Sequence, residues 1–200
     1  MVRSRHAFRL TVAVALVFGL LAGAVHGNDG GLRAAFGNLS APWLVVALVP
    51  GWFAGSAVRG AVVGTAATLV ALLGFYVALT AVMAGHLGDV HGPAHSFTFV
   101  LLANRIWFVA GLISGPLCGA LAGALGPHVR RTWLGVVVGA LMVAEIVVVV
   151  AVQDVEVPVL HVRWGASDLR GYASECVLGL LVVGAVLARS RRARNQVASR

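Results

Sequence analysis

The sequence predicts an all-α protein, a polytopic bundle of about six transmembrane helices with both termini in the cytoplasm. The first observation behind this prediction is composition: of 200 residues, 60% are hydrophobic and 11% are charged, and the mean hydropathy is +0.93. Globular domains carry about 25% charged residues, so a soluble core of this size could not bury the apolar excess. The second observation is a series of long apolar runs, and the third is the position of the arginines between them.

The apolar runs define the spans. A helix needs about 20 apolar residues to cross the ~30 Å hydrocarbon layer of a bilayer, and six runs reach or approach that length. They cover residues 8–25, 42–58, 60–85, 97–126, 133–152 and 171–188. We expect them to form a single membrane domain over residues 1–200, which ends in a basic cytoplasmic tail, residues 189–200.

Two of these runs have alternatives. The first follows a basic stretch and ends near Ala22-Gly23-Ala24, as a cleaved signal peptide would, but its length favours an uncleaved first span. The second begins after Ser40 with Pro42 in its first turn, which suits a helix start. It is short and carries Pro50-Gly51 at its centre. It is therefore either a full span or a broken, re-entrant helix, which lipid tolerates only where protein or water satisfies the freed backbone groups.

The arginines set the orientation, because cytoplasmic loops of membrane proteins carry an excess of basic residues. With both termini inside, eleven arginines fall on the cytoplasmic side and three fall outside. The expected location is the plasma membrane, as a multi-pass protein. The cytoplasmic set is Arg3, Arg5, Arg9, Arg59, Arg130, Arg131, Arg189, Arg191, Arg192, Arg194 and Arg200, and the outer set is Arg33, Arg163 and Arg170.

The net charge of +8 does not indicate a nucleic-acid-binding protein. All fifteen basic residues are arginines, and most of them lie between or at the ends of apolar runs, whereas nucleic-acid binding needs basic residues clustered on one soluble face. The expected partner is the lipid bilayer, with a homo-oligomer or a membrane partner subunit as further alternatives.

Glycines recur at every fourth position of the fourth run. Gly111, Gly115, Gly119 and Gly123 would line one side of a helix and let a neighbouring backbone approach closely. We expect this strip to pack two helices of the same chain, and a homodimer seam is the main alternative.

Ionisable residues within the predicted spans are the candidate functional site. Glu145 lies inside the fifth run and Arg105 lies a few residues into the fourth. At 1.5 Å per residue both lie roughly 10 Å below the outer boundary, so an ion pair is geometrically reasonable. Asn104, next to Arg105, and Glu175, near the outer end of the sixth run, complete the candidate intramembrane polar site.

Two interpretations of this site remain open. An ionisable side chain at membrane depth costs about 2.5–3.5 kcal/mol on insertion scales, so it usually faces a partner or a cavity. In one interpretation the site binds a proton or a small solute. In the other, the charges form a structural pair that fixes the register of the helices.

Evidence for metals, cofactors or catalysis is weak. His86, Asp89, His91 and His95 are suitable ligand types for Zn²⁺ or Cu²⁺, but their spacing matches no tight metal motif. Cys118 and Cys176 fall inside apolar runs, so we expect them to be packing residues. No phosphate-binding Gly-rich Lys loop and no His-Glu-x-x-His motif occurs. We therefore expect no enzyme activity, no catalytic residues, no bound metal and no cofactor.

The sequence also resembles a known kind of protein. The stretches that carry the resemblance are Ala41-Pro42-Trp43-Leu44, Ala54-Gly55, Arg59-Gly60, Gly74-Phe75-Tyr76, Gly115-Pro116-x-x-Gly119 and Ala144-Glu145. Together they resemble a family of small multi-pass membrane proteins of unknown function from high-GC actinobacteria, over about residues 8 to 188. The resemblance implies a membrane bundle and brings no activity, substrate or cofactor.

Two functions follow from these features. One is a small-solute or proton-coupled permease with a site near Glu145 and Arg105. The other is a non-catalytic membrane scaffold or a subunit of a larger membrane complex. A permease should show a water-accessible polar cavity around Glu145, whereas a scaffold should show that charge dry and paired.

Overall fold

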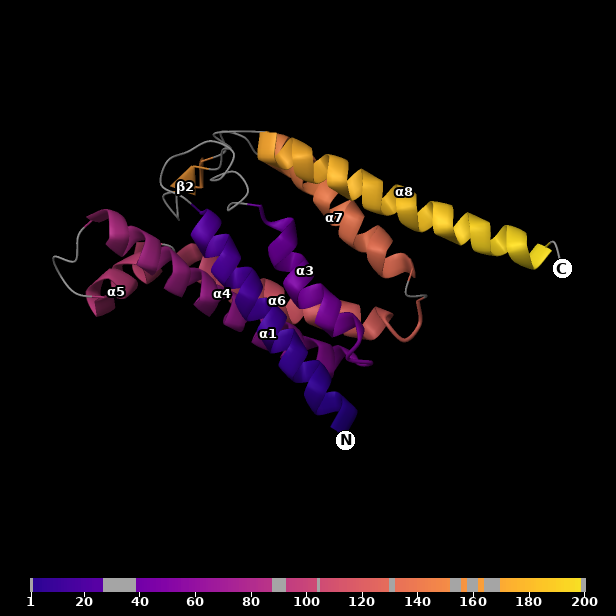
Figure 1. The fold of residues 1–200 in the computed structure, drawn as a ribbon, viewed down its shortest axis with the longest axis horizontal. Helices are drawn as coiled ribbons and strands as arrows, with labels where there is room; N and C mark the ends of the chain where they lie inside the picture. The colour runs from indigo at the N-terminus through magenta and orange to yellow at the C-terminus, as the bar shows by residue number, and fades with distance from the viewer. Residues whose placement is uncertain are drawn as a thin grey trace.

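The computed structural model describes residues 2–26, 39–87, 93–103, 105–129, 132–151, 156–157, 162–163 and 170–198. These residues form an all-α fold with one very short strand pair (Figure 1). The helices are α1 (Val2–Val25), α3 (Ala41–Trp52), α4 (Ala57–Leu87), α5 (Pro93–Ala103), α6 (Arg105–Leu125), α7 (Thr132–Ala151) and α8 (Arg170–Ala198). Strands β1 (Glu156–Val157) and β2 (Val162–Arg163) pair antiparallel between α7 and α8, with Glu156 opposite Arg163.

Among the described residues, five helices are long and apolar enough to cross a bilayer, which is the length and composition of a membrane protein. The crossing segments are Phe8–Val25, Ala57–Met83, Trp107–Leu125, Trp133–Ala151 and Arg170–Arg192. They come from five of the six predicted apolar runs. The fourth run, predicted as one span, begins in α5 and continues in α6.

The second run forms the short helix α3. It has 12 residues, so at 1.5 Å per residue it is about 18 Å long, well below the ~30 Å layer. It ends at Trp52, two residues after Pro50, and a turn containing Gly55 at φ 77° leads into α4. The predicted bounds of 42–58 therefore join a short helix, a turn and the start of the next helix.

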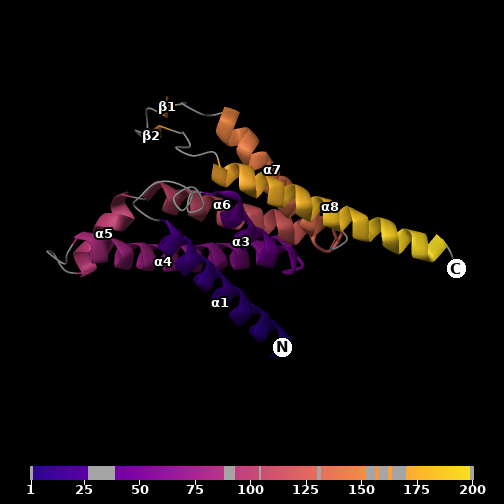
Figure 2. The ribbon, with the colours of Figure 1, turned by 45° about the horizontal axis from the view of Figure 1, so that its top comes forward.

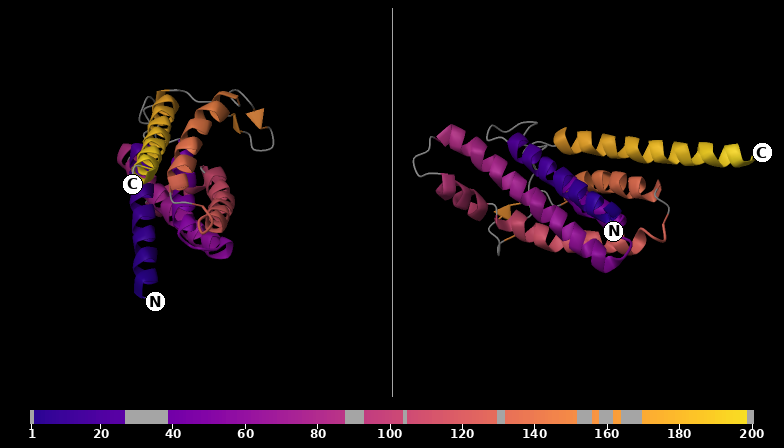
Figure 3. Two further views of the ribbon diagram at one scale, coloured as in Figure 1. Left: turned by 90° about the vertical axis from the view of Figure 1, so that its right-hand side faces the viewer. Right: turned by 60° about the horizontal axis from the view of Figure 1, so that its bottom comes forward.

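Apart from α5, successive helices in the described part of the chain alternate in direction, although α3 is short. Gly19 and Gly23 of α1 face the backbones of Ala71 and Phe75 of α4, so α1 and α4 run parallel. Gly51 of α3 faces Gly119 of α6. Further contacts set the remaining directions: α3 is antiparallel to α4, α6 to α7, and α7 to α8. The views in Figure 2 and Figure 3 show α8 lying beside α7 at the edge of the bundle.

Small residues hold the bundle together where α4 crosses α6. A Cβ atom added to Gly64 would come within 2.6 Å of the Gly115 carbonyl oxygen, and one on Gly119 would come within 3.0 Å of the Gly64 Cα. Gly60 and Gly119 approach each other still more closely, backbone against backbone. The strip predicted from four-residue spacing thus lies at an intramolecular contact, where van der Waals packing replaces the hydrophobic drive that lipid does not provide.

The core lies around the middle of α4. Leu72, Phe75, Tyr76 and Leu79 are buried there against Val100 of α5. Trp43 of α3 packs against this cluster and lies between two aromatic rings, 5.1 Å from the Phe18 centroid and 5.6 Å from the Phe75 centroid. Helix α3 therefore connects the two halves of the bundle, because it packs on α4 and α6 and also on α7.

Candidate functional site

Glu145 of α7 binds the first turn of α3. Its side chain is 8% exposed. Carboxylate Oε1 accepts a hydrogen bond from the backbone N–H of Ser40. Oε2 accepts one from the N–H of Ala41, at 2.6 Å. The carboxylate thus satisfies two of the N–H groups that a helix leaves without a partner at its N-terminus.

The first turn of α3 explains why a carboxylate is needed there. The first N–H groups of a helix have no partner within the helix, and the Ser40 side chain makes no cap hydrogen bond. Pro42 has no N–H, and the N–H groups of Trp43 and Leu44 donate to the Ser40 carbonyl at 3.1 and 3.2 Å. Every backbone N–H from residue 40 to residue 44 is therefore accounted for, two of them by Glu145.

The depth of this contact makes the carboxylate necessary. Glu145 lies six residues before the end of α7 at Ala151, which is about 9 Å along the helix axis. Helix α3 therefore starts beside the interior of a helix that is long and apolar enough to cross a membrane, and not at that helix's end. The positive end of the α3 dipole also favours a negative charge there.

Glu175 of α8 adds a second buried carboxyl group. It is 3% exposed, and neither of its oxygens has a hydrogen-bond partner among the described residues. The Glu175 carboxyl group interacts electrostatically with the carboxyl group of Glu145. Tyr172, one turn earlier on α8, interacts electrostatically with both carboxyl groups. Two carboxylate groups offer only acceptors, so a hydrogen bond between them requires that one carries a proton.

Close packing of α7 on α8 brings the two acids together. A Cβ atom added to Gly139 would lie 2.6 Å from the Gly179 carbonyl oxygen, and one on Gly179 would lie equally close to the Gly139 oxygen. The helices approach closely because neither glycine has a side chain. Their antiparallel register then places Glu145 and Glu175 on facing sides of the same contact.

The other predicted site residues are placed differently. Arg105 begins α6 and its side chain is exposed. The hypothesised ion pair between Arg105 and Glu145 does not occur in the described part of the chain, where Glu145 binds backbone N–H groups instead. Asn104 lies outside the described residues. Of the four predicted residues, the structure brings together Glu145 and Glu175.

Two of the four weak metal candidates lie outside the described residues. Asp89 and His91 are not among the described residues, and His86 and His95 are described only as backbone within α4 and α5. Within the described ranges, no group of three or more His, Cys, Asp or Glu side chains could hold a metal ion.

The sequence reasoning missed the backbone partners of Glu145. Ser40 followed by Pro42 marked a helix start, and the shortness of the second run left a broken, re-entrant helix as an alternative to a full span. Neither signal identifies the acceptor, because Ser40 and Glu145 are 105 positions apart in the chain.

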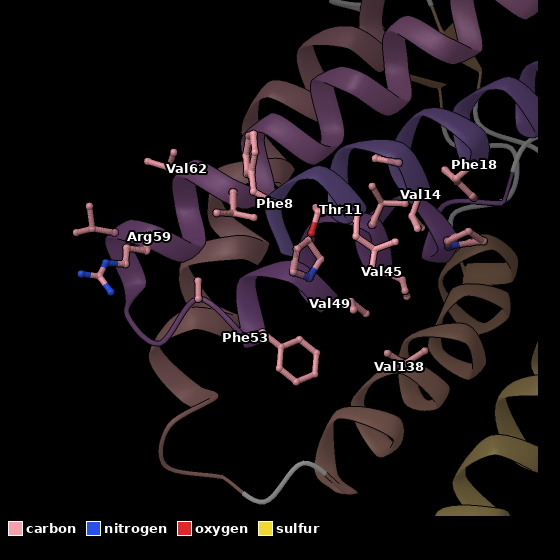
Figure 4. A pocket seen from close by; sticks show the side chains of 18 of the residues that line it. Phe8, Thr11, Val14, Phe18, Val45, Val49, Phe53, Arg59, Val62 and Val138 are labelled. Atoms are coloured by element: carbon pink, nitrogen blue, oxygen red, sulfur yellow. The ribbon is translucent and has the colours of Figure 1, made fainter. Parts of the chain in front are cut away.

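A separate feature is an apolar groove bounded by α1, α3, α4 and α7 (Figure 4). Its volume is about 1100 Å³. Valines of α3 and α4, including Val49 and Val62, line it together with Phe8 and Phe18 of α1. Glu145 and Glu175 are not among its lining residues, so this groove is not a polar cavity around the carboxyl pair.

Comparisons with protein-family models, with curated proteins and with solved structures found no match to this chain. The family resemblance suggested by the sequence therefore stays a prediction.

Proposed function

We propose that this membrane protein is a small proton-coupled permease in which Glu145 and Glu175 form the proton site. The observation that supports it is the buried Glu175 carboxyl group, which has no donor among the described residues and lies next to a second acid. Two adjoining carboxylates in a low-dielectric region repel each other, so such a pair favours holding a proton. An ionisable group at membrane depth is typical of proton pathways in pumps and transporters.

Protonation of this pair would be coupled to α3. While Glu145 is ionised, it holds the N–H groups of Ser40 and Ala41. A proton on Glu145 would remove the charge that attracts the positive end of α3 and weaken both hydrogen bonds, because bonds to charged acceptors are the stronger ones. Short, interrupted helices form the moving or binding elements of many transporters. Proton binding thus supplies a physical means of releasing α3.

The second candidate function is a non-catalytic scaffold or a subunit of a membrane complex. Glu145 is buried and both its oxygens are satisfied by backbone N–H groups, which meets the criterion stated above for a scaffold. The permease proposal therefore rests on the Glu175 carboxyl group, which has no donor among the described residues. In a scaffold the Glu145 carboxylate only caps α3, and a second copy or a partner subunit would cover the lipid-facing surface. For both candidates we propose a plasma-membrane location with both termini in the cytoplasm.

The deciding experiment measures protonation directly. Infrared difference spectra of the protein in liposomes, taken between two pH values, should show the C=O stretch of a carboxyl group gaining a proton. The change Glu175→Gln should remove that band. The matched control is Glu156→Gln, the same substitution in strand β1, which should leave the band in place. A band unaltered in Glu175→Gln would contradict the proton site.

Flux separates the two functions. When the external medium is more acidic and contains the transported solute, the interior of liposomes that contain the wild-type protein should acidify. Glu145→Gln should abolish this acidification. If the carboxyl band is present but no member of a panel of small solutes causes proton movement, the acids hold a structural proton and the scaffold function is favoured.

A further inference from the structure

The apolar groove between α1, α3, α4 and α7 has the shape of a lipid site. Apart from Thr11 and Arg59, its described lining consists of aliphatic and aromatic side chains, proline, and alanine (Figure 4). Ligand pockets usually measure about 300–1,000 Å³, so a volume of about 1100 Å³ has room for a long hydrocarbon chain. Its lining runs along α3 from Pro42 to Pro50 and continues into the turn at Phe53.

The length of the groove matches one leaflet of a bilayer. On α1 its lining runs from Phe8 to Phe18, which is about 15 Å at 1.5 Å per residue. Half of the ~30 Å hydrocarbon layer is also about 15 Å. The groove therefore extends from the membrane surface near the start of α1 to about the middle of the bilayer, as an acyl chain of a single leaflet does.

The mouth of the groove is positively charged. Arg59 is the one charged side chain among its described lining residues, and it lies at the end where Phe8 and Val62 also lie (Figure 4). Arg59 is exposed, and no ion pair joins it to a carboxylate in the described part of the chain. Helix α4 begins two residues earlier at Ala57, so the positive end of its dipole is at the same mouth.

We propose that this groove binds an anionic phospholipid, with an acyl chain between α1 and α3 and the phosphate at Arg59. An apolar cleft one leaflet deep with a single cation at its membrane-surface end fits the two parts of that molecule. This proposal is independent of the proton site, since neither Glu145 nor Glu175 lines the groove.

The test uses vesicles of defined composition. The protein is reconstituted in equal parts of phosphatidylglycerol and phosphatidylcholine with the same acyl chains, extracted in mild detergent, and the retained lipid is counted by mass spectrometry. The wild-type protein should retain one phosphatidylglycerol in preference. Arg59→Gln should reduce that preference about fivefold, because one arginine beside an anionic lipid contributes about 1 kcal/mol. The matched control is Arg191→Gln, which removes an exposed arginine of α8 away from the groove and should have no effect.

A second variant tests the cleft itself. Val62 is 64% exposed and lines the groove, so Val62→Trp should fill it without disturbing the core and reduce retention of both lipids. Val177→Trp, at a 58% exposed position on α8, is the matched control and should retain lipid. All variants are checked for a single elution peak.

Three outcomes would overturn the proposal. Equal retention of the two lipids by the wild-type protein would remove the role of charge. Displacement of the lipid by glycerol phosphate alone would show that the site binds a free phosphate ester and not an acyl chain. A dimer that forms in the wild-type protein and is lost in Val62→Trp would assign the groove to a second copy of this chain.

Discussion

At the scale of single residues, Glu145 and Glu175 are two buried acids with opposite local environments. Glu145 has two backbone donors, whereas Glu175 has none among the described residues. Removing an acceptor from buried donors costs their full desolvation, while removing an unpartnered polar group relieves such a cost. The two residues should therefore respond in opposite directions to the loss of their carboxyl groups.

For Glu145→Ala we expect a loss of stability of about 3 kcal/mol, because two buried N–H groups lose a charged acceptor. Thermal unfolding of the purified protein in detergent measures the change. The control is Val147→Ala on the same helix, where the side chain is 63% exposed and the change should be small. Equal shifts in the two variants would contradict the capping role.

For Glu175→Met we expect the protein to gain about 1–3 kcal/mol of stability. Burying a polar group without a hydrogen bond costs a protein about that much free energy, and the substitution removes this cost. Methionine has a similar length and an adaptable apolar side chain, so the space remains filled. The same unfolding assay applies, at a pH where the wild-type protein is fully folded. A clear loss of stability would show that Glu175 has a donor that the structure does not reveal.

At the scale of helices, glycine spacing sets which helices touch. Gly119 of α6 faces Gly60 and Gly64 of α4 and also Gly51 of α3, so three helices converge on one residue without a side chain. Gly184 of α8, in contrast, has nothing within 4 Å of an added Cβ. Two glycines in transmembrane helices of the same chain thus have different physical roles.

Gly119→Ala should destabilise the bundle by about 1–3 kcal/mol, the usual effect of forcing an extra methyl group into a packed contact. Gly184→Ala should be neutral or stabilise its helix by up to about 1 kcal/mol, because alanine has the higher helix propensity. Thermal unfolding of the two alanine variants, side by side, checks both signs. If they behaved alike, the α4–α6 contact would not depend on close backbone approach.

At the scale of the whole molecule, helices α1, α3, α4, α6, α7 and α8 alternate in direction in the described part of the chain. The alternation follows from helix contacts, whereas the side of the membrane follows only from the distribution of arginines. The cytoplasmic location of both termini is therefore a prediction with its own test.

Cysteine labelling checks this orientation. In a background with Cys118→Ser and Cys176→Ser, a membrane-impermeant thiol reagent should label Asp89→Cys in intact cells. It should label Ser4→Cys and Ser199→Cys only after the cells are opened. Labelling of either terminal position in intact cells would reverse the orientation or change the number of crossings.

Much of the fold was predictable because its determinants are local. The apolar runs gave the crossing helices, and the four-residue glycine period gave the face of α6 that meets α4. The limits of the second run were wrong in their C-terminal part, because Pro50 and Gly55 shorten α3 and an apolar sequence alone does not show whether a helix continues through them. The polar site was predictable in part: Glu145 and Glu175 were singled out, but the partner of Glu145 was not.

The sequence by itself determined that this chain is a helical membrane protein, because a lipid solvent demands long apolar helices and leaves that demand visible in composition. Only the tertiary structure decided that Glu145 caps α3, that Glu175 lies beside it, and that α1 and α3 enclose a groove. These features depend on the relative positions of helices far apart in the chain. Those positions follow from backbone contacts at glycines, whose partners a single sequence does not name.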